Sequence, residues 1–187
     1  IAQTSGANLV NYLRGERANE ANSTGPLFRA RASVLGDIVG SGPVFVGKPP
    51  FKYADSGYSD FVSTHADRSP MVYVAANDGM LHAFSATSST DGNEAWAYVP
   101  RMAMSNMYRL ADIAYSSRHR FILDGTPVVG DIKTAAGWKS ILVGGMGVGA
   151  SGYYALDITD PANPKSLWEF TDSDLGKSFG NPICFHD

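Results

Sequence analysis

The sequence predicts an all-β fold built from four-stranded antiparallel meanders, which are the blades of a β-propeller. Three observations predict it. A hairpin signal stands at 75–84, "AANDGMLHAF", where an Asn-Asp-Gly turn separates two short apolar runs. A strand–turn–strand pattern of this kind occurs twice in the chain, and a small residue followed by proline precedes each copy.

The second halves of the two meanders align with each other without a gap. Residues 81–99 align with residues 153–171, so that "LHAFSAT" matches "YYALDIT" and "NEAWAYV" matches "KSLWEFT". This alignment pairs Trp96 with Trp168. We expect the two tryptophans at equivalent positions in successive blades, each packed between sheets, where truncation to alanine costs about 3–5 kcal/mol.

The elements follow one another in a single partial propeller domain that covers 1–187. In chain order they are an N-terminal helical or linker segment (1–35), blade one (36–100), a helical insertion (101–120), blade two (121–171) and the start of a third blade (172–187). Two blades do not close a ring, so we expect an incomplete propeller. Its open edge, "GNPICF" at 180–185, is expected to self-associate with a second copy or to fold back on its own blades.

Helix is expected only in two short pieces, near 7–17 and 102–114. The first has Leu9, Tyr12 and Leu13 on one face, with Ser5 as its N-cap. The second follows Pro100 and carries a stripe at helical spacing, formed by Met104, Met107, Tyr108 and Ala111. This spacing favours core packing over a cofactor site.

A long insertion at 47–70 separates the first two strands of blade one. It is rich in Pro, Gly, Ser and aromatic residues, and long loops on rigid scaffolds often bind partners. Its candidate partner-binding residues are Phe51, Tyr53, Tyr58 and Phe61. The alternative is that these aromatic side chains pin the loop to the blade.

Composition excludes several classes of function. The net charge of −3 and the absence of a basic stripe argue against nucleic acid as a partner. The apolar runs are strand-sized, so no transmembrane segment is expected. A single cysteine, Cys184, excludes an intrachain disulfide and a multi-cysteine zinc site.

The chemical motifs predict no catalytic, cofactor-binding or metal-ligating residues. The four histidines are scattered, and His82 alternates with apolar neighbours as a packing residue would. The glycines of "GGMGVGASG" (144–152) precede a strand and therefore favour a hairpin over a dinucleotide site. Aspartates beside predicted turns are expected to brace them, or alternatively to converge on the propeller axis: Asp37, Asp78, Asp124 and Asp131.

Several motifs together resemble the PilC/PilY family, the large type IV pilus biogenesis factors and pilus-associated adhesins of Gram-negative bacteria. They are "LRGER" (13–17), "FRARASVLGDIVGSGPVFVG" (28–47), "MVYVAANDGMLHAF" (71–84), "EAWAYVP" (94–100), "FILDGTP" (121–127) and "ILVGGMGVGASGYYALDIT" (141–159). The resemblance implies a modified β-propeller in a protein exported to the outer membrane or cell surface. Two family features are not found in this sequence, the acidic calcium loop and an RGD tripeptide. The resemblance therefore implies that any calcium site lies elsewhere in the parent protein.

The resemblance implies a non-enzymatic surface module in type IV pilus biogenesis. Such a module would oppose pilus retraction and support adhesion and twitching motility, with minor pilins and host or surface ligands as partners. The alternative is a fragment of a quinoprotein (PQQ-dependent) dehydrogenase, because these enzymes share the blade type. A generic surface propeller that binds protein or glycan is a third possibility.

Overall fold

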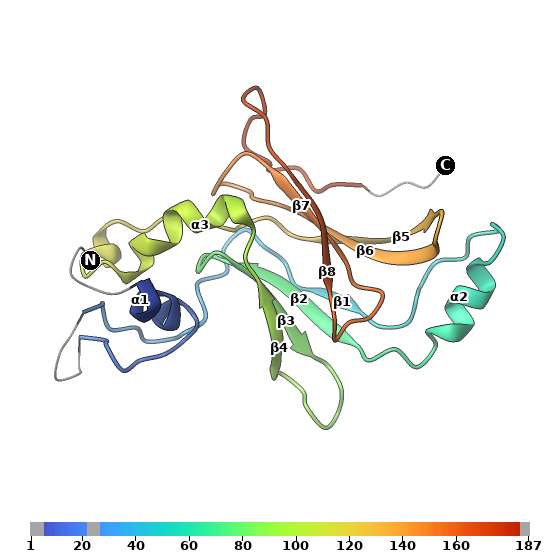
Figure 1. Ribbon diagram of the computed structural model, residues 1–187, viewed down its shortest axis with the longest axis horizontal. Helices are drawn as coiled ribbons and strands as arrows, with labels where there is room; N and C mark the ends of the chain where they lie inside the picture. Colours follow the sequence, from blue (N-terminus) through green and yellow to red (C-terminus); the bar gives the residue numbers. More distant parts are fainter. Residues whose placement is uncertain (1–5, 22–26, 184–187) are drawn as a thin grey trace.

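The computed structural model describes residues 6–21 and 27–183, which form two four-stranded antiparallel sheets (Figure 1). The first sheet has the order β1 (Val44–Val46), β2 (Met71–Ala76), β3 (Met80–Ser85) and β4 (Glu94–Tyr98). The second has the order β5 (Val128–Thr134), β6 (Gly137–Gly145), β7 (Tyr153–Asp157) and β8 (Lys165–Phe170). The predicted fold class is confirmed, since each sheet is a meander of sequence-adjacent strands and the two do not close into a ring.

The strand register confirms the alignment of the repeat. Ala83 of β3 pairs with Trp96 of β4, and Ala155 of β7 pairs with Trp168 of β8. In both sheets the register shifts immediately after the alanine. Because the register shifts at the same aligned position in both sheets, the two tryptophans are structurally equivalent.

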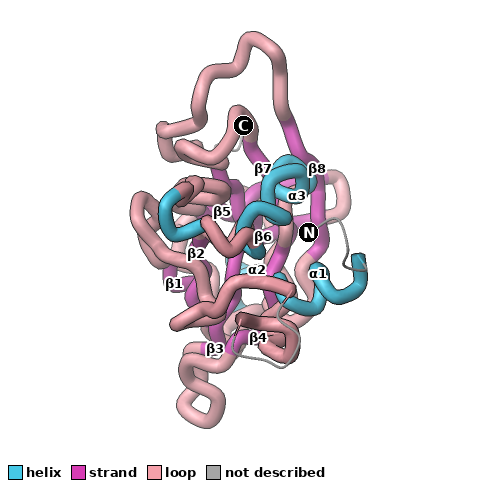
Figure 2. The backbone as a smooth tube through the Cα atoms, turned by 90° about the vertical axis from the view of Figure 1, so that its left-hand side faces the viewer, coloured by secondary structure: helices cyan, strands magenta, loops and turns pink. Residues whose placement is uncertain are grey.

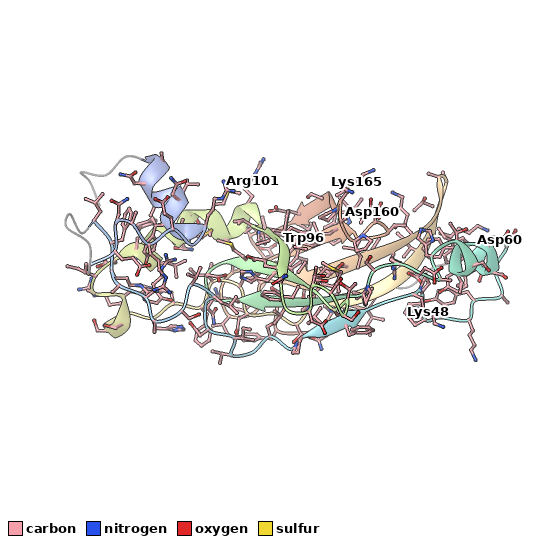
Figure 3. The ribbon with its side chains drawn as sticks, turned by 90° about the horizontal axis from the view of Figure 1, so that it is seen from below. Lys48, Asp60, Trp96, Arg101, Asp160 and Lys165 are labelled. Atoms are coloured by element: carbon pink, nitrogen blue, oxygen red, sulfur yellow. The ribbon has the colours of Figure 1, made fainter. Side chains whose placement is uncertain are left out.

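The two sheets pack face to face through the last strand of the first sheet. The Tyr98 ring lies 5.7 Å from the Tyr154 ring of β7, and the Tyr98 hydroxyl donates to Glu169 of β8 at 2.7 Å. The indole N–H of Trp96 donates to the Pro161 carbonyl in the β7–β8 loop at 2.8 Å; Trp96 and Asp160 of this loop are labelled in Figure 3. Buried side chains of both sheets form one apolar core at this junction.

Trp168 does not pack between sheets, so that expectation is wrong for this residue. The tryptophan face of the first sheet meets the second sheet, whereas the tryptophan face of the second sheet points away from the first. Trp168 is consequently 47% exposed.

Helices occupy the two ends of the molecule (Figure 1). At one end lie α1 (Gly6–Leu13), α3 (Arg101–Met107) and the 3₁₀ turns Tyr108–Ala111 and Tyr115–Ser117. The helix α2 (Tyr58–Thr64) lies at the other end, beside the β5–β6 hairpin. No helix among the described residues is long and apolar enough to cross a membrane.

The helices depart from the sequence prediction in three ways. The first ends at Leu13, four residues early, because the chain turns there and Gly15 adopts φ 108°. The second gives way to a 3₁₀ turn after Met107. Met107 and Ala111 are buried but Met104 is 56% exposed, so the predicted core stripe holds only in part. The third is α2, which was not expected at all. The predicted N-cap, Ser5, lies outside the described residues.

The N-terminal segment is fixed by a buried ion pair. Arg31 contacts Glu20 at 2.8 Å, and both side chains are almost fully buried. The Arg31 guanidinium also lies 3.7 Å from the centre of the Tyr12 ring and donates to the Tyr12 carbonyl. Arg31 also donates to the Glu16 carbonyl and Arg17 donates to the Arg31 carbonyl, which joins the "LRGER" and "FRAR" motifs into one structural unit.

The predicted strand at 180–185 does not form over its described residues, 180–183 (Figure 2). In the two sheets, β1 and β5 are each held by the strand that follows them in the chain, and no described strand follows Ile183. Pro182 and Ile183 instead lie against the outer face of the second sheet. Cys184 and Phe185 lie outside the described residues.

Candidate binding surfaces

The four predicted aromatic residues of the insertion come together around Trp138 of β6. The Phe51 and Tyr53 rings stack at 5.2 Å, and the Tyr53 ring stacks on Trp138 at 5.6 Å. Tyr58 meets the same indole edge-on at 4.7 Å, and Phe61 completes the cluster. Sequence reasoning missed Trp138, which has no counterpart in the first blade to draw attention to it.

Burial divides this aromatic cluster into two parts. Tyr58 and Phe61 point inward from α2 and are buried, at 1% and 7% exposure. Phe51 and Tyr53 are half-buried and border the solvent. The cluster therefore fixes the insertion to the second sheet, and only the Phe51–Tyr53 stack is accessible to a partner.

A buried polar chain runs beneath the aromatic cluster. The Tyr58 hydroxyl donates to Asp131 at 2.7 Å, the Ser140 hydroxyl donates to Asp131 at 2.6 Å, and Arg68 donates to Ser140 at 2.7 Å. Burial, and then the hydrogen bond to Asp131, raise the pKa of Tyr58. Arg68 also donates to the Gly47 carbonyl, so both ends of the insertion are tied to the second sheet.

Carboxylates brace the segment that leads into β1. Gly36 N–H donates to Asp78 and Gly40 N–H donates to Asp124, both at 2.8 Å. A Cβ on Gly36 would lie 2.3 Å from the Asp78 backbone nitrogen, so only glycine fits this close approach. Asp131 differs from the expectation, because it lies within β5 and binds the two hydroxyls described above.

His82 is buried on the outer face of the first sheet, between two carboxylates. Its Nδ1 lies 2.6 Å from Glu94, and its Nε2 lies 3.1 Å from both oxygens of Asp78. Burial would lower the pKa of His82, but the hydrogen bond and charge of Asp78, then those of Glu94, outweigh it and raise the pKa. The predicted packing role is correct, but the ionic partners were missed.

The outer face of the second sheet presents an apolar groove of about 450 Å³. Ile141 and Val143 of β6 form its floor, and Trp168 and Phe170 of β8 border it. Because Trp168 is equivalent to Trp96, this face of the second sheet corresponds to the face of the first sheet that packs on the second.

No group of three or more His, Cys, Asp or Glu side chains in the described part of the chain is arranged to hold a metal ion. The expectation of no cofactor in this chain remains a prediction.

Comparison with known proteins identifies this pair of sheets. The family described as the PilY1 beta-propeller domain matches residues 35–181. The chain is 43% identical over 185 residues to a type IV pilus biogenesis factor PilY1 homolog of Xylella fastidiosa, covering 95% of this chain and 15% of that protein. It is 42% identical over 193 residues to the type IV pilus biogenesis factor PilY1 of Pseudomonas aeruginosa strain PAK, covering 97% of this chain and 16% of that protein.

A solved structure agrees with these relatives. The crystal structure of the Pseudomonas aeruginosa PilY1 C-terminal domain superimposes with a TM-score of 0.59 and 36% identity, covering 74% of this chain and 28% of that one. The chain thus spans about a sixth of the length of the curated relatives it matches. From the matched residues and both sheets, the chain belongs to the PilY1 β-propeller domain family.

Proposed function

We propose that this chain is a non-enzymatic binding module of a type IV pilus biogenesis factor. The observation that carries the proposal is the family match over residues 35–181, which includes both sheets. The relatives reported above are named type IV pilus biogenesis factors, which favours this role over a quinoprotein dehydrogenase. A shared blade type is the only feature that supports the dehydrogenase.

The polar side chains of the blades support a binding role over a catalytic one. Asp78 and Asp124 accept backbone N–H groups, and Asp131 accepts two hydroxyls, so these carboxylates are engaged in the scaffold. The two surfaces described above for a partner, the Phe51–Tyr53 stack and the groove beside Trp168, are aromatic or apolar. Such surfaces suit protein contacts better than proton transfer.

The full protein is proposed to be exported to the outer membrane or cell surface and to oppose pilus retraction, supporting adhesion and twitching motility. Minor pilins are the proposed partners inside the pilus machinery, with host or surface ligands outside it. The test counts surface pili in a strain that lacks the gene, with and without its retraction ATPase. Pili that disappear only when the ATPase is present agree with the proposal. Unchanged piliation contradicts it, and pili missing in both backgrounds indicate a role in assembly instead.

The Phe51–Tyr53 stack is the proposed contact for a pilus component. Phe51→Ala removes its solvent-facing ring and leaves the buried pair Tyr58 and Phe61 in place. We expect the variant to fold and to lose co-purification with minor pilins. Phe179→Ala, at a residue that is 69% exposed elsewhere on the chain, is the matched control and should retain the partner. If both variants retained the minor pilins equally, the Phe51–Tyr53 stack would not be part of the interface.

The groove beside Trp168 is proposed to receive a further blade of the propeller, and a second copy when the chain is isolated. The argument for another blade is that the groove has an apolar floor on the face equivalent to the one through which the first sheet packs on the second. Ile183→Lys places a charge at this groove and should convert a self-associated chain into a monomer, as measured by light scattering at micromolar concentration. A wild-type chain that is already monomeric contradicts the self-association.

A further inference from the structure

Residues 34–37, called the strap below, form a wall between two hollows of the surface. One hollow has a volume of about 630 Å³ and contains His82. The other has a volume of about 320 Å³ and contains Arg29. Val34 and Leu35 of the strap line both hollows, together with Leu13 and Asp78, so movement of the strap would open part of the wall between them.

Polar contacts hold the strap in place. Gly36 N–H donates to Asp78 at 2.8 Å, and Asp37 accepts from the Asn77 side chain at 2.9 Å and contacts His119 at 3.0 Å. The apolar residues Val34 and Leu35 are 39% and 36% exposed, so their burial contributes only part of the attachment. The hydrogen bond from the Gly36 N–H to Asp78 anchors the middle of the strap.

Asp78 accepts the Met80 N–H at 3.1 Å and also faces His82, and it is the contact with His82 that depends on a proton. The imidazole of His82 faces Asp78 through Nε2 and Glu94 through Nδ1. A neutral imidazole carries one N–H, so it can donate to only one of two carboxylates and must present a lone pair to the other. Only the imidazolium donates to both at once.

The other charged groups near His82 do not replace this proton. Arg14, after α1, lines the same hollow but is exposed. Phe84, the ring stacked 5.8 Å from His82 on β3, carries no charge. Asp37 of the strap contacts Asn77 and His119 instead. The two carboxylates therefore dominate around His82, in agreement with its raised pKa.

We propose that the strap is a proton-controlled gate, closed while His82 is an imidazolium and loosened when His82 loses its proton, which joins the two hollows. The inference is independent of the proposed pilus function. Its sign follows from the raised pKa of His82: the stabilisation is complete below the unfolded-state pKa and is lost as pH rises through the folded-state pKa.

The test is amide hydrogen exchange of Gly36 in the 187-residue chain, measured by NMR between pH 6 and 9 and corrected for the intrinsic dependence on pH. We expect protection to fall across the His82 titration, by up to about ten-fold for each unit by which closure raises the pKa. The His82 titration is followed in the same samples through its ring nitrogens. Constant Gly36 protection through that titration would overturn the proposal.

Three variants separate the gate from a general loss of structure. His82→Gln removes the titrating group and should abolish the change with pH. Glu94→Gln keeps the histidine but removes one carboxylate, so the midpoint should move to lower pH. His119→Gln is the control and should retain the wild-type midpoint. A midpoint that disappears in His119→Gln would assign the effect to His119, which contacts Asp37, and would overturn the role of His82.

Discussion

Replacing Trp96 by alanine should destabilise the chain more than replacing Trp168, although the repeat makes the two residues equivalent. Trp96 packs against Tyr73, with ring centres 5.6 Å apart, and its indole N–H bonds the Pro161 carbonyl across the junction. Trp168 borders an open groove and is 47% exposed. The difference tests whether the junction between the sheets is built as described.

The magnitudes follow from burial. Removing a large aromatic side chain from a packed junction costs about 3–5 kcal/mol, and the Trp96→Ala change also leaves a carbonyl without its donor. Trp168 buries about half of the roughly 200 Å² that a tryptophan can bury, which at about 25 cal/mol/Å² gives at most about 2.5 kcal/mol. We therefore expect the loss for Trp96→Ala to exceed that for Trp168→Ala by at least about 0.5 kcal/mol.

The assay is urea unfolding followed by circular dichroism, which avoids the change in fluorescence that removal of a tryptophan causes. Both variants are compared with wild type at the same protein concentration, because self-association through the groove would also affect stability. Equal losses, or a larger loss for Trp168→Ala, would refute the assignment of the buried and open faces.

Two further predictions concern the second sheet. Gly144→Ala would place a Cβ 2.2 Å from the Tyr154 ring, so it should lower the free energy of unfolding by about 1–3 kcal/mol, while Gly176→Ala, with no atom within 4 Å of its Cβ, should change it little. Burial would raise the pKa of Asp157, but the hydrogen bonds and charge of Lys139, with Thr159, lower it. Its stabilisation is present above the unfolded-state pKa of about 3.9 and is lost as pH falls through the lower folded-state pKa. Denaturation between pH 2 and 6 should show this loss in wild type and not in Asp157→Asn.

The repeated part of the fold could be predicted because its signals are local. A strand alternates with a period of two residues and its turns need particular residues, so the alignment of residues 81–99 with 153–171 carried over into the same pairing and the same irregularity.

The departures from prediction depend on contacts that are distant in sequence. The helix α2 forms in a Gly- and Pro-rich insertion because Tyr58 and Phe61, three residues apart, pack with Trp138 of β6 in one buried cluster. The exposure of Trp168 depends on which face of a sheet has a neighbour, and alternation along a strand does not reveal this. The link between His82 and Glu94 spans two strands, although Asp78, in the hairpin turn four residues before His82, is a local signal for its other ionic partner.

The packing of the two sheets as successive blades is tested most directly by a double-mutant cycle between Tyr98 and Glu169. The variants Tyr98→Phe, Glu169→Met and their combination remove the hydroxyl, the carboxylate or both, and methionine keeps about the same side-chain length. Because the hydroxyl donates to the carboxylate across the junction at 2.7 Å, we predict a coupling of about 1 kcal/mol in the free energy of unfolding. Effects that add with no coupling would mean that the two side chains do not meet and that the sheets are not packed in this way.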